Sequence, residues 1–100
     1  MIRGTTPTHT FTLPFDSTGI TKLSIAYAQG GRVVLEKTLP DCNIKGNVIT
    51  VSLTEEDTLK FDSNKAMAEI QLRLGFGDSR MASQVMHITT ERILKDGCLE

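Results

Sequence analysis

Apolar and polar residues alternate with a period of two through most of this chain. The pattern is clearest between positions 68 and 76, where Glu69, Gln71 and Arg73 separate apolar neighbours. It recurs in three further segments, whose apolar members are Phe11, Leu13 and Phe15, then Leu23, Ile25 and Tyr27, then Ile49, Val51 and Leu53. Because successive side chains of a strand point to opposite faces, this period predicts β-strands with one face in a core and the other in water.

Glycine-containing turns separate these segments, with QGGR at 29–32, KGN at 45–47 and GDSR at 77–80. Two adjacent glycines both tolerate positive φ, as a tight hairpin turn requires. We therefore expect seven strands, at about 8–15, 20–28, 32–38, 42–45, 48–53, 66–76 and 81–90. This spacing predicts an all-β fold, an immunoglobulin-like two-sheet antiparallel β-sandwich.

The segment LTEEDTLKF, at 53–61, departs from the alternation. Thr54 and Asp57 have the spacing of a capping box, and the acidic residues that follow Thr54 suit the positive end of a helix. We expect a short helical turn at 54–60 that carries the chain from one sheet to the other, as the E–F corner does in immunoglobulin-like sandwiches. Two apolar side chains are expected to fold from it onto the core, those of Leu59 and Phe61.

Length and charge are those of one small domain. Of the 100 residues, 11 are Lys or Arg and 12 are Asp or Glu, so the net charge of −1 gives no reason to expect nucleic acid or a membrane as partner. We expect one sandwich domain over 1–98, with Leu99 and Glu100 as an expression-vector remnant. Two cysteines, Cys42 and Cys98, are too few for a disulfide framework and are expected to be reduced thiols.

Residues capable of chemistry do not form a recognisable constellation. The acids Glu55, Glu56 and Asp57 are consecutive, so a helix would splay them apart, and we interpret them as decoration of a helix N-terminus. His9 and His87 belong to no metal-binding motif, and each is expected to be a half-buried strand residue. GFGDSR at 75–80 is interpreted as a hairpin turn, because a phosphate loop needs a following helix. The sequence therefore predicts no catalytic, cofactor-binding or metal-binding residue, no cofactor and no enzyme.

Methionines gather in the last two expected strands, at Met67, Met81 and Met86. Methionine fills irregular gaps in cores and also adapts to partners at binding surfaces. Core filling is the favoured interpretation, and a partner surface is the alternative. Met67 is the best candidate for the alternative, because strict alternation places it on the polar face with Glu69 and Gln71.

Three stretches resemble a known group of proteins: RGTTPTHTFTLPFD at 3–16, IAYAQGGRVVLEK at 25–37, and VSLTEEDTLKF at 51–61 followed by EIQLRL at 69–74. Their order is similar to that of the N-terminal immunoglobulin-like domain of phage baseplate upper proteins, and of small phage or prophage proteins of Gram-positive bacteria. The resemblance spans about residues 3–89. It implies a stand-alone module, made in the bacterial cytoplasm, with incorporation in a virion left open.

The leading functional hypothesis is a structural or assembly module of a baseplate or tail, which contacts other phage or prophage proteins or further copies of itself. The mechanism would be docking at a strand edge or on a sheet face. Two alternatives stay open. One is a small-ligand or carbohydrate-binding module, and the other is an enzyme that brings His9 or His87 next to Cys42, Cys98 or the acidic trio.

Overall fold

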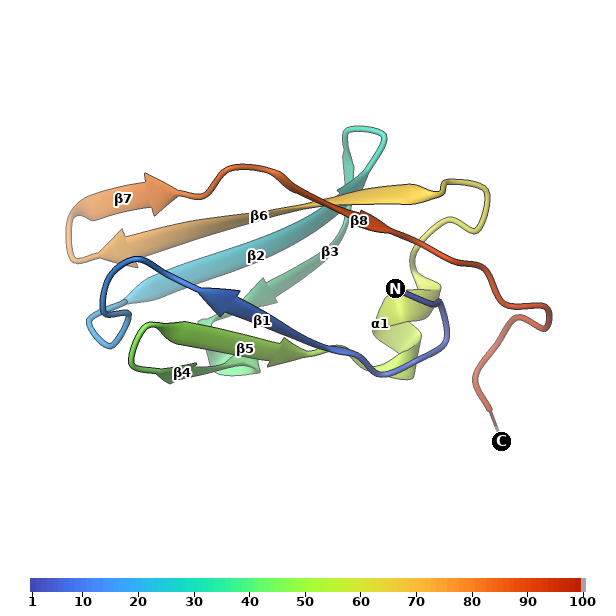
Figure 1. Cartoon of the computed structure of the whole chain (residues 1–100), viewed down its shortest axis with the longest axis horizontal. Helices are drawn as coiled ribbons and strands as arrows, with labels where there is room; N and C mark the ends of the chain where they lie inside the picture. Colours follow the sequence, from blue (N-terminus) through green and yellow to red (C-terminus); the bar gives the residue numbers. More distant parts are fainter. Residues whose placement is uncertain (100) are drawn as a thin grey trace.

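Two antiparallel sheets face each other in the computed structural model, which describes residues 1–99 (Figure 1). The three-stranded sheet has the order β1-β5-β4, and the five-stranded sheet has the order β3-β2-β6 with β7 and β8 both paired to β6. The strands are β1 (Thr8–Thr12), β2 (Lys22–Gln29), β3 (Arg32–Thr38), β4 (Cys42–Lys45), β5 (Val48–Ser52), β6 (Met67–Phe76), β7 (Ser79–Ala82) and β8 (Met86–Thr89). The predicted all-β sandwich is confirmed, with eight strands among the described residues in place of seven.

The core lies between the sheets and consists mainly of apolar members of the alternating segments. Ile25, Tyr27, Ile49 and Leu72 are at most 1% exposed. Burial of each such side chain contributes about 1.5–3 kcal/mol, which makes the alternation the main energetic determinant of the fold. None of the helices in residues 1–99 is long and apolar enough to span a membrane.

The three predicted hairpin turns are confirmed. Gly30 and Gly31 both have positive φ, of 58° and 79°, and they join β2 to β3 through a two-residue turn. At the turns after β4 and β6 only the first central residue, Gly46 or Gly77, has a positive φ. Primed turns of this kind match the twist of antiparallel strands, so the glycines fix the register of the hairpins.

The predicted ends of the first and last strands are wrong. β1 ends at Thr12, because the ladder to β5 ends where the Leu13 N–H donates to Asn47 O and Pro14 has no N–H to continue it. The segment expected as one strand at 81–90 is two strands, β7 and β8. Between them the Ser83 hydroxyl accepts the Leu72 N–H at 3.0 Å, so a side chain takes the place of a backbone acceptor and interrupts the strand.

The predicted helical turn at 54–60 is confirmed as α1 (Glu55–Leu59), which carries the chain from β5 in one sheet to β6 in the other. A second turn, η1 (Leu39–Asp41), carries it from β3 to β4 and was not predicted. The predicted capping box is present, since Thr54 Oγ1 accepts the Asp57 N–H at 3.0 Å and Asp57 Oδ2 accepts the Thr54 N–H at 2.9 Å. Phe61 is 1% exposed and belongs to the core, as expected. Leu59 is only half-buried and lies outside the core cluster, so that expectation is wrong.

Candidate functional site

Of the acidic trio, only Asp57 makes an ion pair within residues 1–99. Asp57 is buried and pairs with Lys37 of β3, whose Nζ lies 2.8 Å from Asp57 Oδ2, while Glu56 is exposed. Burial acts to raise the pKa of Asp57, but the hydrogen bonds from Lys37 and Thr54 outweigh it and hold that pKa below its ordinary value. The acids occupy the first turn of α1, as the helix N-terminal interpretation expects. The charge of Asp57 in addition joins the corner helix to the five-stranded sheet, a contact that was not predicted.

Strand order separates His9 from Cys42. Both residues are paired with Val51 of the central strand β5, so Val51 stands between them in the three-stranded sheet. The His9 ring is half-buried, as predicted, and its Nδ1 lies 2.7 Å from the hydroxyl of Tyr27 on the opposite sheet. Burial raises the pKa of the Cys42 thiol, whereas an activated nucleophilic thiol has a lowered pKa. His9, Val51 and Cys42 therefore lie side by side on three strands and pack toward the interior, and His9 and Cys42 do not form a catalytic Cys–His pair.

His87 and Cys98 lie elsewhere on the surface. His87 is exposed on β8, with Nε2 3.8 Å from Glu69 Oε2, so the expectation that it is half-buried is wrong. Cys98 is exposed in the C-terminal segment. Within residues 1–99, His, Cys, Asp and Glu side chains form no group of three or more that could hold a metal ion.

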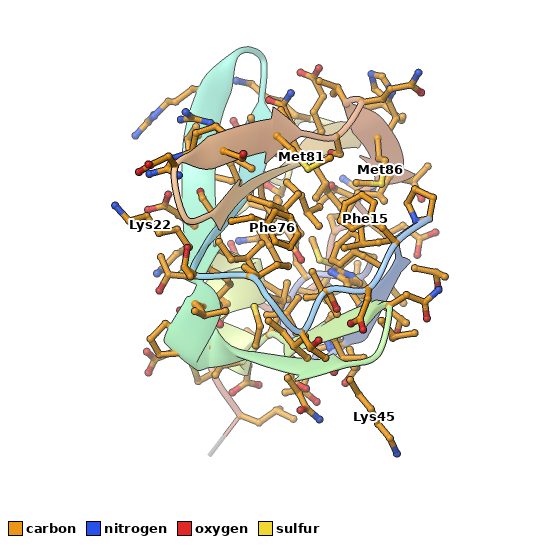
Figure 2. The ribbon with its side chains drawn as sticks, turned by 90° about the vertical axis from the view of Figure 1, so that its left-hand side faces the viewer. Phe15, Lys22, Lys45, Phe76, Met81 and Met86 are labelled. Carbon is orange, nitrogen blue, oxygen red and sulfur yellow. The ribbon has the colours of Figure 1, made fainter. Side chains whose placement is uncertain are left out.

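Two of the three methionines face solvent. Met67 is 47% exposed and Met81 is 44% exposed, so core filling is wrong for both, whereas Met86 packs partly buried against the core. Figure 2, which looks at the molecule from one end, shows Phe15 and Phe76 between the sheets, with Met81 and Met86 on the side of the five-stranded sheet. These two rings meet edge to face, with centroids 5.8 Å apart. Met67 on β6 and Met81 on β7 thus place apolar side chains on the surface of the five-stranded sheet.

Free sheet edges are the other places where a partner can bind, and three of the four carry protection. β3 has a register shift against β2 and the charged residues Arg32, Glu36 and Lys37. β4 is four residues long and ends in Lys45, and β7 and β8 are short and interrupted. Bulges, charges and short strands are the devices that prevent edge pairing. β1, with the sequence THTFT, has none of them among its own residues.

The hydrogen bonds at each end of β1 define which of its backbone groups are free. Pro7 O accepts the Leu53 N–H, and the Leu13 N–H donates to Asn47 O. Since backbone groups of an antiparallel strand alternate in direction, His9 and Phe11 bond to β5. The N–H and C=O groups of Thr8, Thr10 and Thr12 therefore point outward, along a free edge.

A groove of about 600 Å³ runs beside this edge, between β1 and the segment that joins β7 to β8. It is lined by Thr10, Phe11, Thr12, Leu13, Pro14, Leu72, Ser83, Gln84 and Met86. We call β1 together with this groove the open edge. The period-two alternation does not identify the open edge, because the order of the strands within a sheet decides which strand lies at its edge. The available signal was the absence of Lys, Arg, Asp and Glu between Pro7 and Pro14.

Comparison with known proteins adds no identification. A scan against protein-family models finds no match, and searches of curated proteins and of solved structures find none either.

Proposed function

We propose that this chain is a non-enzymatic structural or assembly module that acts by protein–protein contact through the open edge. The observation that carries the proposal is the contrast among the four sheet edges, of which β1 alone lacks protection. An immunoglobulin-like sandwich of phage or prophage origin, placed in a baseplate or tail, is the setting that the sequence resemblance supports.

The occupant that best fits the open edge is β1 of a second copy. In an antiparallel pair centred on Thr10, Thr8 of one copy would lie opposite Thr12 of the other, and cross-strand threonine pairs are favourable. His9 would lie opposite the second copy's Phe11 on the inner face, which extends the apolar lining of the groove. The segment carries no Lys, Arg, Asp or Glu that would repel its own copy. Such a pair is self-complementary and closes with two-fold symmetry.

Light scattering over a range of concentrations tests this proposal. The wild type is expected to move from the mass of one chain toward that of two as its concentration rises, and Thr10→Lys is expected to remain monomeric. Thr50→Lys is the matched control, because Thr50 is paired with Thr10 and presents the same face from the central strand. Thr10→Pro is a second variant that is expected to prevent pairing, because it removes the outward-pointing Thr10 N–H. The fold should tolerate it, since that N–H makes no bond to β5.

A monomeric wild type at every concentration would overturn self-pairing. Association that persists in folded Thr10→Lys and Thr10→Pro would also overturn it, because the contact would then lie elsewhere. Far-UV circular dichroism of each variant establishes that the sandwich is intact.

A further inference from the structure

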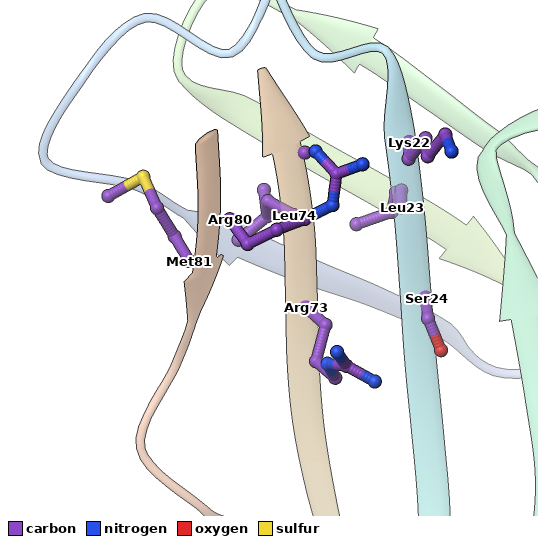
Figure 3. Close-up of a pocket in the computed structure, with 8 residues that line it drawn as sticks. Lys22, Leu23, Ser24, Arg73, Leu74, Arg80 and Met81 are labelled. Atoms are coloured by element: carbon purple, nitrogen blue, oxygen red, sulfur yellow. The ribbon is translucent and has the colours of Figure 1, made fainter. Parts of the chain in front are cut away.

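A cationic hollow of about 190 Å³ lies on the outer face of the five-stranded sheet, away from the open edge (Figure 3). Lys22 of β2, Gly75 of β6 and Arg80 of β7 are paired side by side, and Ser24 is paired with Arg73 one step along. These pairings bring onto one face the cationic side chain of Lys22 from β2 and those of Arg73 and Arg80 from the β6–β7 hairpin. All three are exposed.

Gly75 makes room for Arg80. Its φ is not positive, so the backbone does not require glycine there. A Cβ at this position would lie 3.1 Å from Arg80 Nη1 and 3.1 Å from Lys22 Cβ. Figure 3 shows the Arg80 side chain crossing β6 toward Lys22. Glycine within a strand often marks a close approach of another group, and here that group is a guanidinium.

Arg80 is also held in place. Its Nη1 donates to Gly77 O at 2.6 Å and to Ser79 O at 3.0 Å, both in the turn between β6 and β7. These bonds leave the Nε and Nη2 hydrogens without a protein acceptor among the described residues. A fixed guanidinium loses little conformational entropy when it binds a ligand.

Within residues 1–99, no ion pair neutralises the positive charge of the hollow. The ion pairs within residues 1–99 involve Arg3, Lys37, Lys60 and His87, and none involves the three cations of the hollow. The Glu36 carboxylate accepts the Ser24 hydroxyl at 2.6 Å beside the hollow and makes no ion pair with these three cations. A chain of net charge −1 therefore gathers at one place three cationic side chains that form no ion pair within residues 1–99.

We infer that this hollow binds a phosphate-type oxyanion. Arg80 would supply planar donors that suit two oxygens of one phosphoryl group, and Lys22 and Arg73 would supply further positive charge. The same group could come from free phosphate or from phosphates repeated along a polymer. This inference does not depend on the proposed function.

The test is a two-dimensional amide NMR titration of the whole chain with inorganic phosphate and, separately, with linear polyphosphate, at low and constant ionic strength. Sodium chloride is the reference titrant. We expect saturable shifts confined to amides near Lys22, Arg73 and Arg80. Saturation with both titrants indicates recognition of the phosphoryl group itself, and saturation with polyphosphate alone indicates a polymer as the source. Shifts that follow chloride equally, or that do not saturate with either phosphate, would overturn the inference.

Three variants separate the hollow from general electrostatics. Arg80→Gln is expected to weaken binding about tenfold or more, as the loss of a charge-assisted hydrogen-bonding group does. Lys45→Gln removes one positive charge from the opposite sheet; Figure 2 shows that Lys45 lies far from Lys22. This variant is expected to change the affinity for phosphate less than about twofold. Gly75→Ala keeps every charge but crowds Arg80, so it too is expected to weaken binding. Equal effects of Arg80→Gln and Lys45→Gln would contradict a specific site.

Discussion

Asp57→Asn removes the negative charge that joins helix α1 to strand β3 and leaves the shape of the side chain nearly unchanged. The asparagine carbonyl oxygen can still accept the Thr54 N–H, so the capping box is preserved. What is lost is the charge-assisted contact of 2.8 Å between Lys37 Nζ and Asp57 Oδ2. The substitution therefore isolates the electrostatic part of the corner.

The magnitude follows from the burial of the pair. The side chains of Lys37 and Asp57 are 15% and 10% exposed. An exposed ion pair contributes about 0.2–1 kcal/mol, whereas removal of one partner from a fully buried pair costs about 3–5 kcal/mol. Lys37 keeps some access to water, so we expect a loss of about 1.5–3 kcal/mol in the free energy of unfolding. For a domain of this size that lowers the melting temperature by about 4–8 °C per kcal/mol.

The stability lost in Asp57→Asn is expected to depend on pH. The pKa of Asp57 is lowered in the folded protein from its ordinary value of 3.8. A lowered carboxyl pKa stabilises the fold above the unfolded pKa, and this stabilisation is lost as the pH falls through the folded pKa. The difference between wild type and Asp57→Asn is therefore expected to be full at about pH 7, to shrink as the pH falls from the unfolded pKa through the folded pKa, and to be lost below both.

Urea unfolding followed by circular dichroism measures both quantities. Asp62→Asn is the matched control, because Asp62 is exposed and has no ion pair among the described residues. Lys37→Met removes the other partner and completes a double-mutant cycle with Asp57→Asn. A variant as stable as the wild type at neutral pH, or a difference that persists undiminished in acid, would refute this account of the corner.

Three further predictions follow from burial. Phe61→Ala is expected to cost about 3–5 kcal/mol and Leu59→Ala about 1–2 kcal/mol in urea unfolding, because Phe61 is in the core and Leu59 lies outside it. Glu55→Gln and Glu56→Gln are each expected to change stability by well under about 1 kcal/mol, and a loss as large as that of Phe61→Ala would contradict the helix N-terminal role. Burial, and secondarily the N-terminal charge, lowers the pKa of His9 from 6.5, so the unfolding free energy is expected to fall as the pH drops below that value and to fall less in His9→Gln.

Alternation predicted the positions of most strands because each strand has one buried face. β3 lies at the predicted residues, since Gly30 and Gly31 fix its start and Leu39–Asp41 fixes its end. The errors arose where a single contact overrides the pattern. The break between β7 and β8 depends on a hydrogen bond between Ser83 and Leu72, which lie eleven residues apart and whose pairing the local period does not encode.

The open edge and the cationic hollow could not be predicted from the sequence for a related reason. Whether β1 lies at an edge depends on the order of the strands, and a period-two pattern is the same for edge and central strands of a two-layer sandwich. Lys22, Arg73 and Arg80 become neighbours only through the register of β2, β6 and β7. The sequence identified which faces are polar but not which polar side chains meet.

The two proposed surfaces are separable because they belong to different sheets. Pairing through β1 would extend the three-stranded sheet, while the hollow lies on the outer face of the five-stranded sheet, so each copy of a dimer would keep its hollow free. Two hollows in one dimer would bind a long polyphosphate more tightly than a single phosphate, since the second contact is intramolecular. Thr10→Lys is therefore expected to leave the affinity for inorganic phosphate unchanged and to weaken that for polyphosphate, whereas Arg80→Gln is expected to weaken both. Loss of inorganic phosphate binding in a folded Thr10→Lys variant would show that the surfaces are coupled.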